Sequence, residues 1–140
     1  MTNEHVLVFE TEQAIPITVS SSSAFEKGAM VKLADPFTVS ASLGIDDVVG
    51  GIVKIEKTAT DGKIKLAIYR RGIFKGTASG NITAGDSLGS ANQADGLNQL
   101  YNNKVTANLS GNVVWGIALE TCTDGETFLY ELNPQCLTTA

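Results

Sequence analysis

The chain has 140 residues, 43% of them hydrophobic and 18% charged, which is enough apolar material for one domain with its own core. Its formal net charge of −5 argues against nucleic-acid binding, because that needs a basic stripe to displace counterions from phosphates. No apolar run approaches the roughly 20 residues of a membrane-spanning helix. The first 13 residues carry three Glu and no Lys or Arg, unlike a signal peptide. We therefore expect no nucleic acid and no membrane as partners, and synthesis in a cytoplasm.

Residues 1–24 predict an extended N-terminal arm. The stretch 6–17 is apolar and β-prone, but Pro16 cannot donate to a ladder, which favours an edge strand or an arm. Ser20–Ser23 predicts a polar turn or hinge. The one histidine, His5, falls in this arm, so we expect it to be solvated and assign it no catalytic role.

Residues 25–140 predict a single β-rich domain whose first half is built of short strands. Ala29, Val31 and Leu33 alternate on one face of a strand. Gly50-Gly51, in the middle of the next apolar run, indicates a bulge or a close backbone approach. Asp61-Gly62 between alternating runs predicts a tight type I′ hairpin.

The second half repeats the first. The stretch "VVGGIVKIEKTATDGK" (48–63) is echoed by "VVWGIALETCTDGE" (113–126). Between them, Leu97 to Tyr101 is compatible with one helical turn, although its neighbours favour a polar loop. Each copy has an apolar face that it cannot bury alone, so we expect the two to close on each other. The predicted fold is mostly β: a small pseudo-duplicated β-barrel or sandwich with an extended N-terminal arm and at most one or two short helices.

No group of residues predicts catalysis, a metal site or a cofactor. A paired-carboxylate site needs two carboxyls facing each other across a cleft, whereas Asp46 and Asp47 are sequence neighbours. Cys122 and Cys136 are too far apart for a CxxC motif, and we expect free thiols, with a disulfide as the minor alternative. The chain is thus expected not to be an enzyme.

Two other classes stay open on the residues alone. A carbohydrate-binding β module would use Trp115 and Tyr101 as a platform for sugar rings. A hydrolase with an unrecognised site is the third class. In a β domain, however, single aromatic residues at period two are more typical of a core or of subunit contacts.

Several segments resemble the small capsid cement, or head decoration, proteins of tailed bacteriophages. The family pattern has an x-G-x-F segment, an A-G-x-I-x-A-G-D turn, a late x-G-x-A-x-E strand and a short final strand. The corresponding segments here are Gly72–Phe74, Ser79–Asp86, Gly116–Glu120 and Phe128–Leu132. The stretches "ITVSSSSAFEKGAMVKL" (17–33) and "VVGGIV" (48–53) also match, so the resemblance covers most of the chain from Ile17 onward. Two stretches, "DPFTVSASLGID" and "NQADGLNQLYNNKVTANLS", are longer than is usual in the family.

The resemblance implies a homotrimer that binds the major capsid protein on the outer surface of the virion and stabilises the shell at three-fold or quasi-three-fold positions. It implies no cofactor, and an N-terminal arm that orders on the capsid by adding to a sheet edge. The expected capsid-binding residues of the arm are Val6, Leu7, Val8, Phe9, Ile15 and Ile17. The expected trimer-interface residues are Phe25, Phe74 and Trp115.

Overall fold

The structure, a computed structural model, describes residues 3–41, 48–91, 98–102 and 112–137. Within these ranges every regular element is a β-strand, which confirms the mostly-β prediction, and none is a helix that could cross a membrane. The strands are β1 (Val6–Phe9), β2 (Ile15–Thr18), β3 (Met30–Ala34), β4 (Thr38–Ala41), β5 (Val49–Val53), β6 (Lys65–Tyr69), β7 (Gly72–Ser79), β8 (Ser87–Ser90), β9 (Leu100–Asn102), β10 (Asn112–Ala118) and β11 (Thr127–Leu137).

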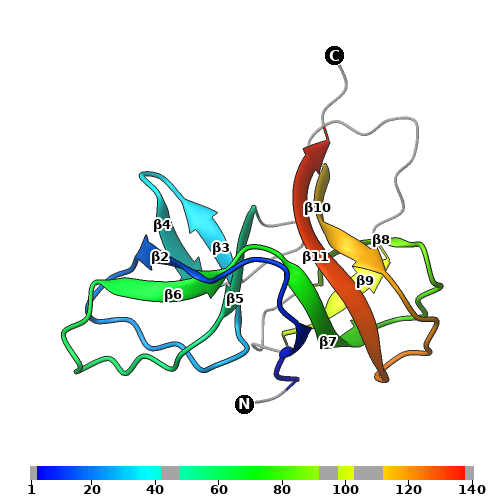
Figure 1. Cartoon of the computed structure of the whole chain (residues 1–140), viewed down its shortest axis with the longest axis horizontal. Helices are drawn as coiled ribbons and strands as arrows, with labels where there is room; N and C mark the ends of the chain where they lie inside the picture. The colour runs from blue at the N-terminus through cyan, green and yellow to red at the C-terminus, as the bar shows by residue number, and fades with distance from the viewer. Residues whose placement is uncertain (1–2, 42–47, 92–97, 103–111, 138–140) are drawn as a thin grey trace.

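The strands form two closed five-stranded barrels that lie side by side (Figure 1). Barrel 1 closes in the order β2-β4-β3-β5-β6. Barrel 2 has the order β7-β9-β8-β10-β11, and β1 is added to the outside of β7. Each barrel has one parallel pairing, β2 with β4 and β7 with β9, and is otherwise antiparallel. The two halves therefore share one topology, as the repeated sequence predicts.

The two barrels also repeat individual hydrogen bonds. The Gly28 N–H donates to the Val53 carbonyl at 2.9 Å, and the Gly85 N–H donates to the Ala118 carbonyl at 2.8 Å. Both glycines have a positive φ, 82° and 94°, which a residue without a side chain adopts at little cost. Val53 and Ala118 therefore occupy equivalent positions in the two barrels.

The Thr-x-Thr-Asp-Gly stretch occurs in both halves, but its two copies do not occupy equivalent positions in the two barrels: they are shifted by two residues. The Thr58 N–H donates to the Asp61 carboxylate at 3.1 Å, and the Thr123 N–H donates to the Glu126 carboxylate at 3.2 Å. Asp61 thus corresponds to Glu126. The prediction of a tight hairpin at Asp61-Gly62 is wrong, because residues 54–64 connect β5 to β6 and Asp61 caps a turn inside this longer loop.

Two other local predictions had different outcomes. The bulge at Gly50-Gly51 is confirmed, since the β3–β5 register shifts opposite Gly51, which has a φ of 137° and no room for a Cβ beside the Tyr69 carbonyl. The helical turn from Leu97 to Tyr101 is wrong in its described part, because Leu100–Asn102 forms β9. This strand is needed between β7 and β8 to close barrel 2, so tertiary pairing overrides local preference.

The apolar core has two parts. One fills barrel 1 and the other fills barrel 2, but the second also includes Met30, Ile52 and Tyr69 from the outer side of barrel 1. The ring of Tyr69 meets the ring of Phe74 edge-on at 5.7 Å between centroids. Barrel 1 therefore covers one side of barrel 2, and the pair packs as one unit.

Candidate functional site

The strand β1 lies outside barrel 2 as an added edge strand. It pairs antiparallel with β7, with Val6 opposite Lys75 and Leu7 opposite Phe74, and a bulge follows Leu7. Leu7 is half-buried against the core, whereas Val6, Val8 and Phe9 are exposed, Phe9 at 62%. Because β1 ends the ladder in the described part of the chain, its outer edge has no strand partner there.

His5 holds the start of β1 in place. Its Nε2 lies 2.9 Å from the Asn98 carbonyl and its Nδ1 lies 2.7 Å from the Tyr130 hydroxyl. A carbonyl can only accept, so Nε2 carries the proton and the Tyr130 hydroxyl donates to Nδ1. Burial lowers the pKa of His5 to about 4, which keeps the ring neutral. The expectation of a solvated His5 is wrong, because the ring is enclosed between β11 and the segment before β9.

Asn98 links this region to barrel 1. Its side-chain oxygen accepts from the Met30 N–H at 2.7 Å, and its Nδ2 donates to the carbonyls of Gly28 at 3.1 Å and Asn3 at 2.8 Å. The His5 N–H also donates to the Gly28 carbonyl. Side-chain and backbone groups of the N-terminal segment, barrel 1 and barrel 2 therefore meet in one buried network, and β1 sits on a rigid base.

The outward side chains of β1 and of the three strands next to it in the sheet form a largely apolar surface. Ladder register places Ile117, Glu131, Ile73 and Phe9 in one row across β10, β11, β7 and β1. A second row has Leu129, Lys75 and Val6, with Leu119 next to Leu129 through a backbone hydrogen bond of 2.8 Å. We call these eight residues the outer sheet face. Six of them are apolar, of which Val6, Phe9, Ile117 and Leu119 are exposed and two are half-buried, and exposed apolar surface of this kind is typical of an interaction site.

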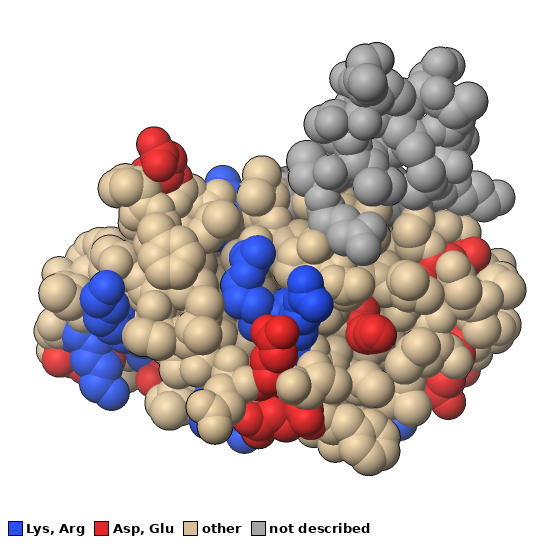
Figure 2. Space-filling view, turned by 45° about the horizontal axis from the view of Figure 1, so that its top comes forward, with Lys and Arg blue, Asp and Glu red and all other residues tan. Residues whose placement is uncertain are grey.

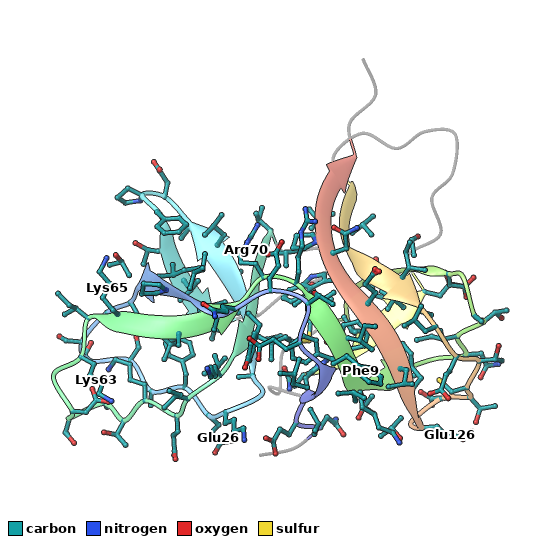
Figure 3. All side chains as sticks on the ribbon, viewed as in Figure 1. Phe9, Glu26, Lys63, Lys65, Arg70 and Glu126 are labelled. Atoms are coloured by element: carbon teal, nitrogen blue, oxygen red, sulfur yellow. The ribbon has the colours of Figure 1, made fainter. Side chains whose placement is uncertain are left out.

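Charged groups elsewhere on the surface are sparse. Figure 2 shows small groups of basic and acidic side chains separated by wide uncharged areas. Arg70 lies at the junction of the barrels (Figure 3), where its guanidinium donates to the carbonyls of Val49 and Gly50. Arg71 beside it makes a loose ion pair with Glu12 at 3.9 Å. Burial, with the neighbouring Arg71 charge, lowers the pKa of Arg70.

Hollows lie on two sides of the junction between the barrels. A hollow of about 360 Å³ is lined by Val6 and Leu7 of β1 and by Ile52 and Lys54 of barrel 1. A second, of about 390 Å³, is lined by Ile15, Arg70 and Pro134 among others. Among the described residues, no three His, Cys, Asp or Glu side chains gather as a metal site would require.

The six expected arm residues have different environments. Val6, Val8, Phe9 and Ile15 are exposed, and Leu7 is half-buried. Ile17 is fully buried inside barrel 1, opposite Leu66, so in this fold it belongs to the core. The four exposed residues, Val6, Val8, Phe9 and Ile15, are available for a contact with a partner.

The three residues expected at the trimer interface are all interior. Phe25 is nearly buried, and Phe74 and Trp115 are enclosed within the cores of a single chain. Trp115 has 0% exposure, so its ring is not presented to a sugar as the carbohydrate interpretation requires. Its indole N–H has no hydrogen-bond partner in the part of the chain described. Tyr101, the other aromatic of that interpretation, is half-buried in β9.

The cysteines and the neighbouring aspartates are partly within the described residues. Cys122 is a buried free thiol whose pKa is raised by burial and by the nearby carboxylates of Glu126 and Glu120, so it is not an activated nucleophile. Asp46 and Asp47 lie outside the described residues, as does the side chain of Cys136.

Two comparisons with known proteins found a match, one to a family model and one to a solved structure. The family model described as phage cement protein matches residues 9–132 of this chain. A similar solved structure is the head fiber gp8.5 N base of bacteriophage phi29, with a TM-score of 0.53 and 12% sequence identity, over 90% of this chain and 98% of that one. At this identity the likeness shows a shared fold. A search of curated proteins found no match to the chain.

Proposed function

The chain belongs to the phage cement protein family and is a capsid-associated phage protein, and we propose that it binds the outer surface of the head and stabilises the shell. In this proposal it is a homotrimer that contacts the major capsid protein at three-fold or quasi-three-fold positions. It works by binding and carries out no reaction.

The observation that carries the proposal is the exposure of β1 on a rigid base. Val6, Val8 and Phe9 face solvent, while His5 and Leu7 fasten the strand to barrel 2. Edge strands with exposed apolar side chains are normally protected, because they pair readily with other chains. The outer edge of β1 has no strand partner among the described residues and is held in a fixed position, so it is suited to bind a strand or an apolar surface of the capsid protein.

The energies involved are sufficient for a stabilising contact when copies act together. Burial of one valine or phenylalanine side chain contributes about 1.5–3 kcal/mol. Three such side chains per chain, less the cost of association, give a weak single contact. A trimer that engages three capsid subunits at once converts weak contacts into a tight one through effective concentration.

The chemistry of the described residues supports a non-catalytic role. The buried His5 is neutral and its two nitrogens are both bonded within the chain, so it has no free position for a substrate. The pKa of Tyr130 is raised far above its usual value by burial, which rules against a phenolate. Cys122 is likewise not activated.

A co-sedimentation experiment tests the proposal. Purified protein is mixed with undecorated phage heads, and the pelleted fraction is measured for the parent chain, Phe9→Lys and Ile64→Lys. Phe9 and Ile64 are 62% and 60% exposed, so the two variants place the same charge at sites of equal exposure, one on β1 and one on barrel 1. We expect Phe9→Lys to weaken binding at least tenfold and Ile64→Lys to leave it unchanged. Absence of pelleting by the parent chain would contradict the proposal.

A further inference from the structure

The contact between the two barrels uses a row of side chains that occurs twice in the chain. In barrel 1 the row is Met30, Ile52 and Tyr69, which are neighbours across β3, β5 and β6. The position before Val53 in barrel 1 corresponds to the position before Ala118 in barrel 2, so Ile52 corresponds to Ile117. The ladder then makes Ser87 and Glu131 the equivalents of Met30 and Tyr69, and we call Ile117 and Glu131 the free row.

The two copies of the row have opposite environments. Ile52 is 1% exposed because barrel 2 covers it, and β5 lies on the side of barrel 1 that faces barrel 2 (Figure 1). Its equivalent Ile117 is 45% exposed on the outer sheet face. The half of the inter-barrel contact that barrel 1 contributes is thus present on barrel 2 without a cover in the described chain.

The other half of the contact is also repeated. Phe74 meets Tyr69 and is paired with Tyr130 on β11. Since Glu131 corresponds to Tyr69, Tyr130 corresponds to Ile68 on β6. Ile68 is paired with Ile15, which is therefore the equivalent of Phe74. Phe74 is buried, but Ile15 is 39% exposed. The sequence echo aligns Val113, a member of the same buried cluster, with Val48, which is 52% exposed. We call Ile15 and Val48 the free rim of barrel 1.

The charges of the two free surfaces are complementary. The hollow at the rim is lined by Ile15, by Arg70 and Arg71, and by Glu12, which pairs loosely with Arg71, so the rim carries one net positive charge. In the free row, Glu131 replaces the tyrosine of barrel 1. Glu131 lines a hollow with Arg71 and Glu12 of its own chain, and in a contact between copies it would face the arginines of the next rim.

From these equivalences we infer that copies of this chain associate head to tail, with the free row of barrel 2 in one copy packed on the free rim of barrel 1 in the next. This repeats between chains the contact that joins the two barrels within a chain. It deepens the homotrimer of the proposed function, on which it rests, by assigning the contact. The contact is heterologous, so three copies form a ring where the rotation between neighbours closes. In this arrangement Ile15 lies between copies and β1 remains for the head.

A mixing experiment distinguishes this arrangement from any other. Ile117→Lys removes the row and leaves the rim, while Val48→Lys removes the rim and leaves the row. Mass in solution is measured by analytical ultracentrifugation for the parent chain, each variant, an equimolar mixture of the two, and the control Ile64→Lys. Far-UV circular dichroism verifies that every variant is folded.

We expect the parent and Ile64→Lys to be oligomers, each single variant to be a monomer, and the mixture to form a one-to-one dimer through the intact row and the intact rim. A monomeric parent chain overturns the inference. It is also overturned by single variants that remain oligomeric, or by two monomeric variants that form no dimer when mixed. Should Ile117→Lys fail to fold, Ile117→Ser replaces it, and should Val48→Lys fail to fold, Ile15→Lys replaces it in the same mixture. Head binding is measured separately by co-sedimentation, so a monomer that still pellets with heads would overturn this inference and leave the proposed attachment intact.

Discussion

The imidazole of His5 and the hydroxyl of Tyr130, 125 residues apart in the sequence, lie 2.7 Å from each other in the interior. Their rings also meet edge-on, with centroids 5.6 Å apart. The contact ties the beginning of the chain to the middle of its last strand. Because β1 follows directly, the placement of the exposed Phe9 depends on this buried pair.

The first prediction concerns the pH dependence of stability. The pKa of His5 is about 4 in the folded chain and about 6.5 in the unfolded chain. Above pH 6.5 both states are neutral, and between pH 6.5 and 4 only the unfolded state binds the proton, so the free energy of unfolding falls as the pH falls. The loss is about 3 kcal/mol in total. Urea denaturation at several pH values measures it.

His5→Gln isolates this effect. Glutamine has no titrating group, while every carboxylate is retained, so the difference between the two pH profiles reports His5 alone. We expect the parent to lose about 3 kcal/mol more than the variant between pH 7 and pH 4. Parallel profiles would show that His5 is not a buried neutral group.

The second prediction concerns Gly76. A Cβ at this position would lie 2.8 Å from Tyr130 Cε1 and 2.9 Å from the His5 ring. Gly76→Ala should therefore destabilise the chain by about 1–3 kcal/mol. In a His5→Ala background the same change should cost less, because the space is then vacant. Additive effects in this double-mutant cycle, measured by thermal or urea unfolding, would contradict the contact.

The third prediction concerns a buried lysine in the loop between β5 and β6. The Lys57 ammonium is buried and donates to the carbonyls of Ser21, Ser23 and Thr58 at 2.9–3.0 Å and to the Asp61 carboxylate at 3.2 Å. Lys57→Met removes the donor and leaves three carbonyls without it. We expect a loss of at least about 2 kcal/mol in the free energy of unfolding.

An exposed lysine supplies the control for this change. Lys63→Met makes the same substitution in the same loop, at an exposed site. It should alter stability by no more than about 0.5 kcal/mol. Equal effects at the two positions would mean that the Lys57 hydrogen bonds contribute nothing.

The duplication could be predicted from the sequence because two short continuous stretches, 48–63 and 113–126, repeat the same residues. The two-valine segments align in the sequence without a gap up to Val53 and Ala118, which occupy equivalent positions in the two barrels, and the Gly50-Gly51 bulge follows from the absence of a Cβ. That each half closes into a barrel of its own could not be predicted, since it depends on parallel pairings such as Thr18 with Thr38, which have no local signature.

The buried polar groups were missed for the same reason. His5 lies near the start of the chain, and its partners Asn98 and Tyr130 are remote in sequence. The burial of Lys57 could have been inferred from the repeat, because Lys57 occupies the position in barrel 1 that the buried Cys122 occupies in barrel 2. Each makes the matching isolated bridge, Lys57 with Phe25 and Cys122 with Ile82. The two-residue slip in the sequence echo concealed this equivalence.

The most direct measurement is a cryo-electron microscopy map of heads mixed with the purified protein, at a resolution that separates strands. The account predicts density for two joined barrels on the outer surface of the shell, with β1 and the side chain of Phe9 against a capsid subunit. A map in which the protein is attached with β1 facing solvent, or in which the heads carry no added density, would contradict it.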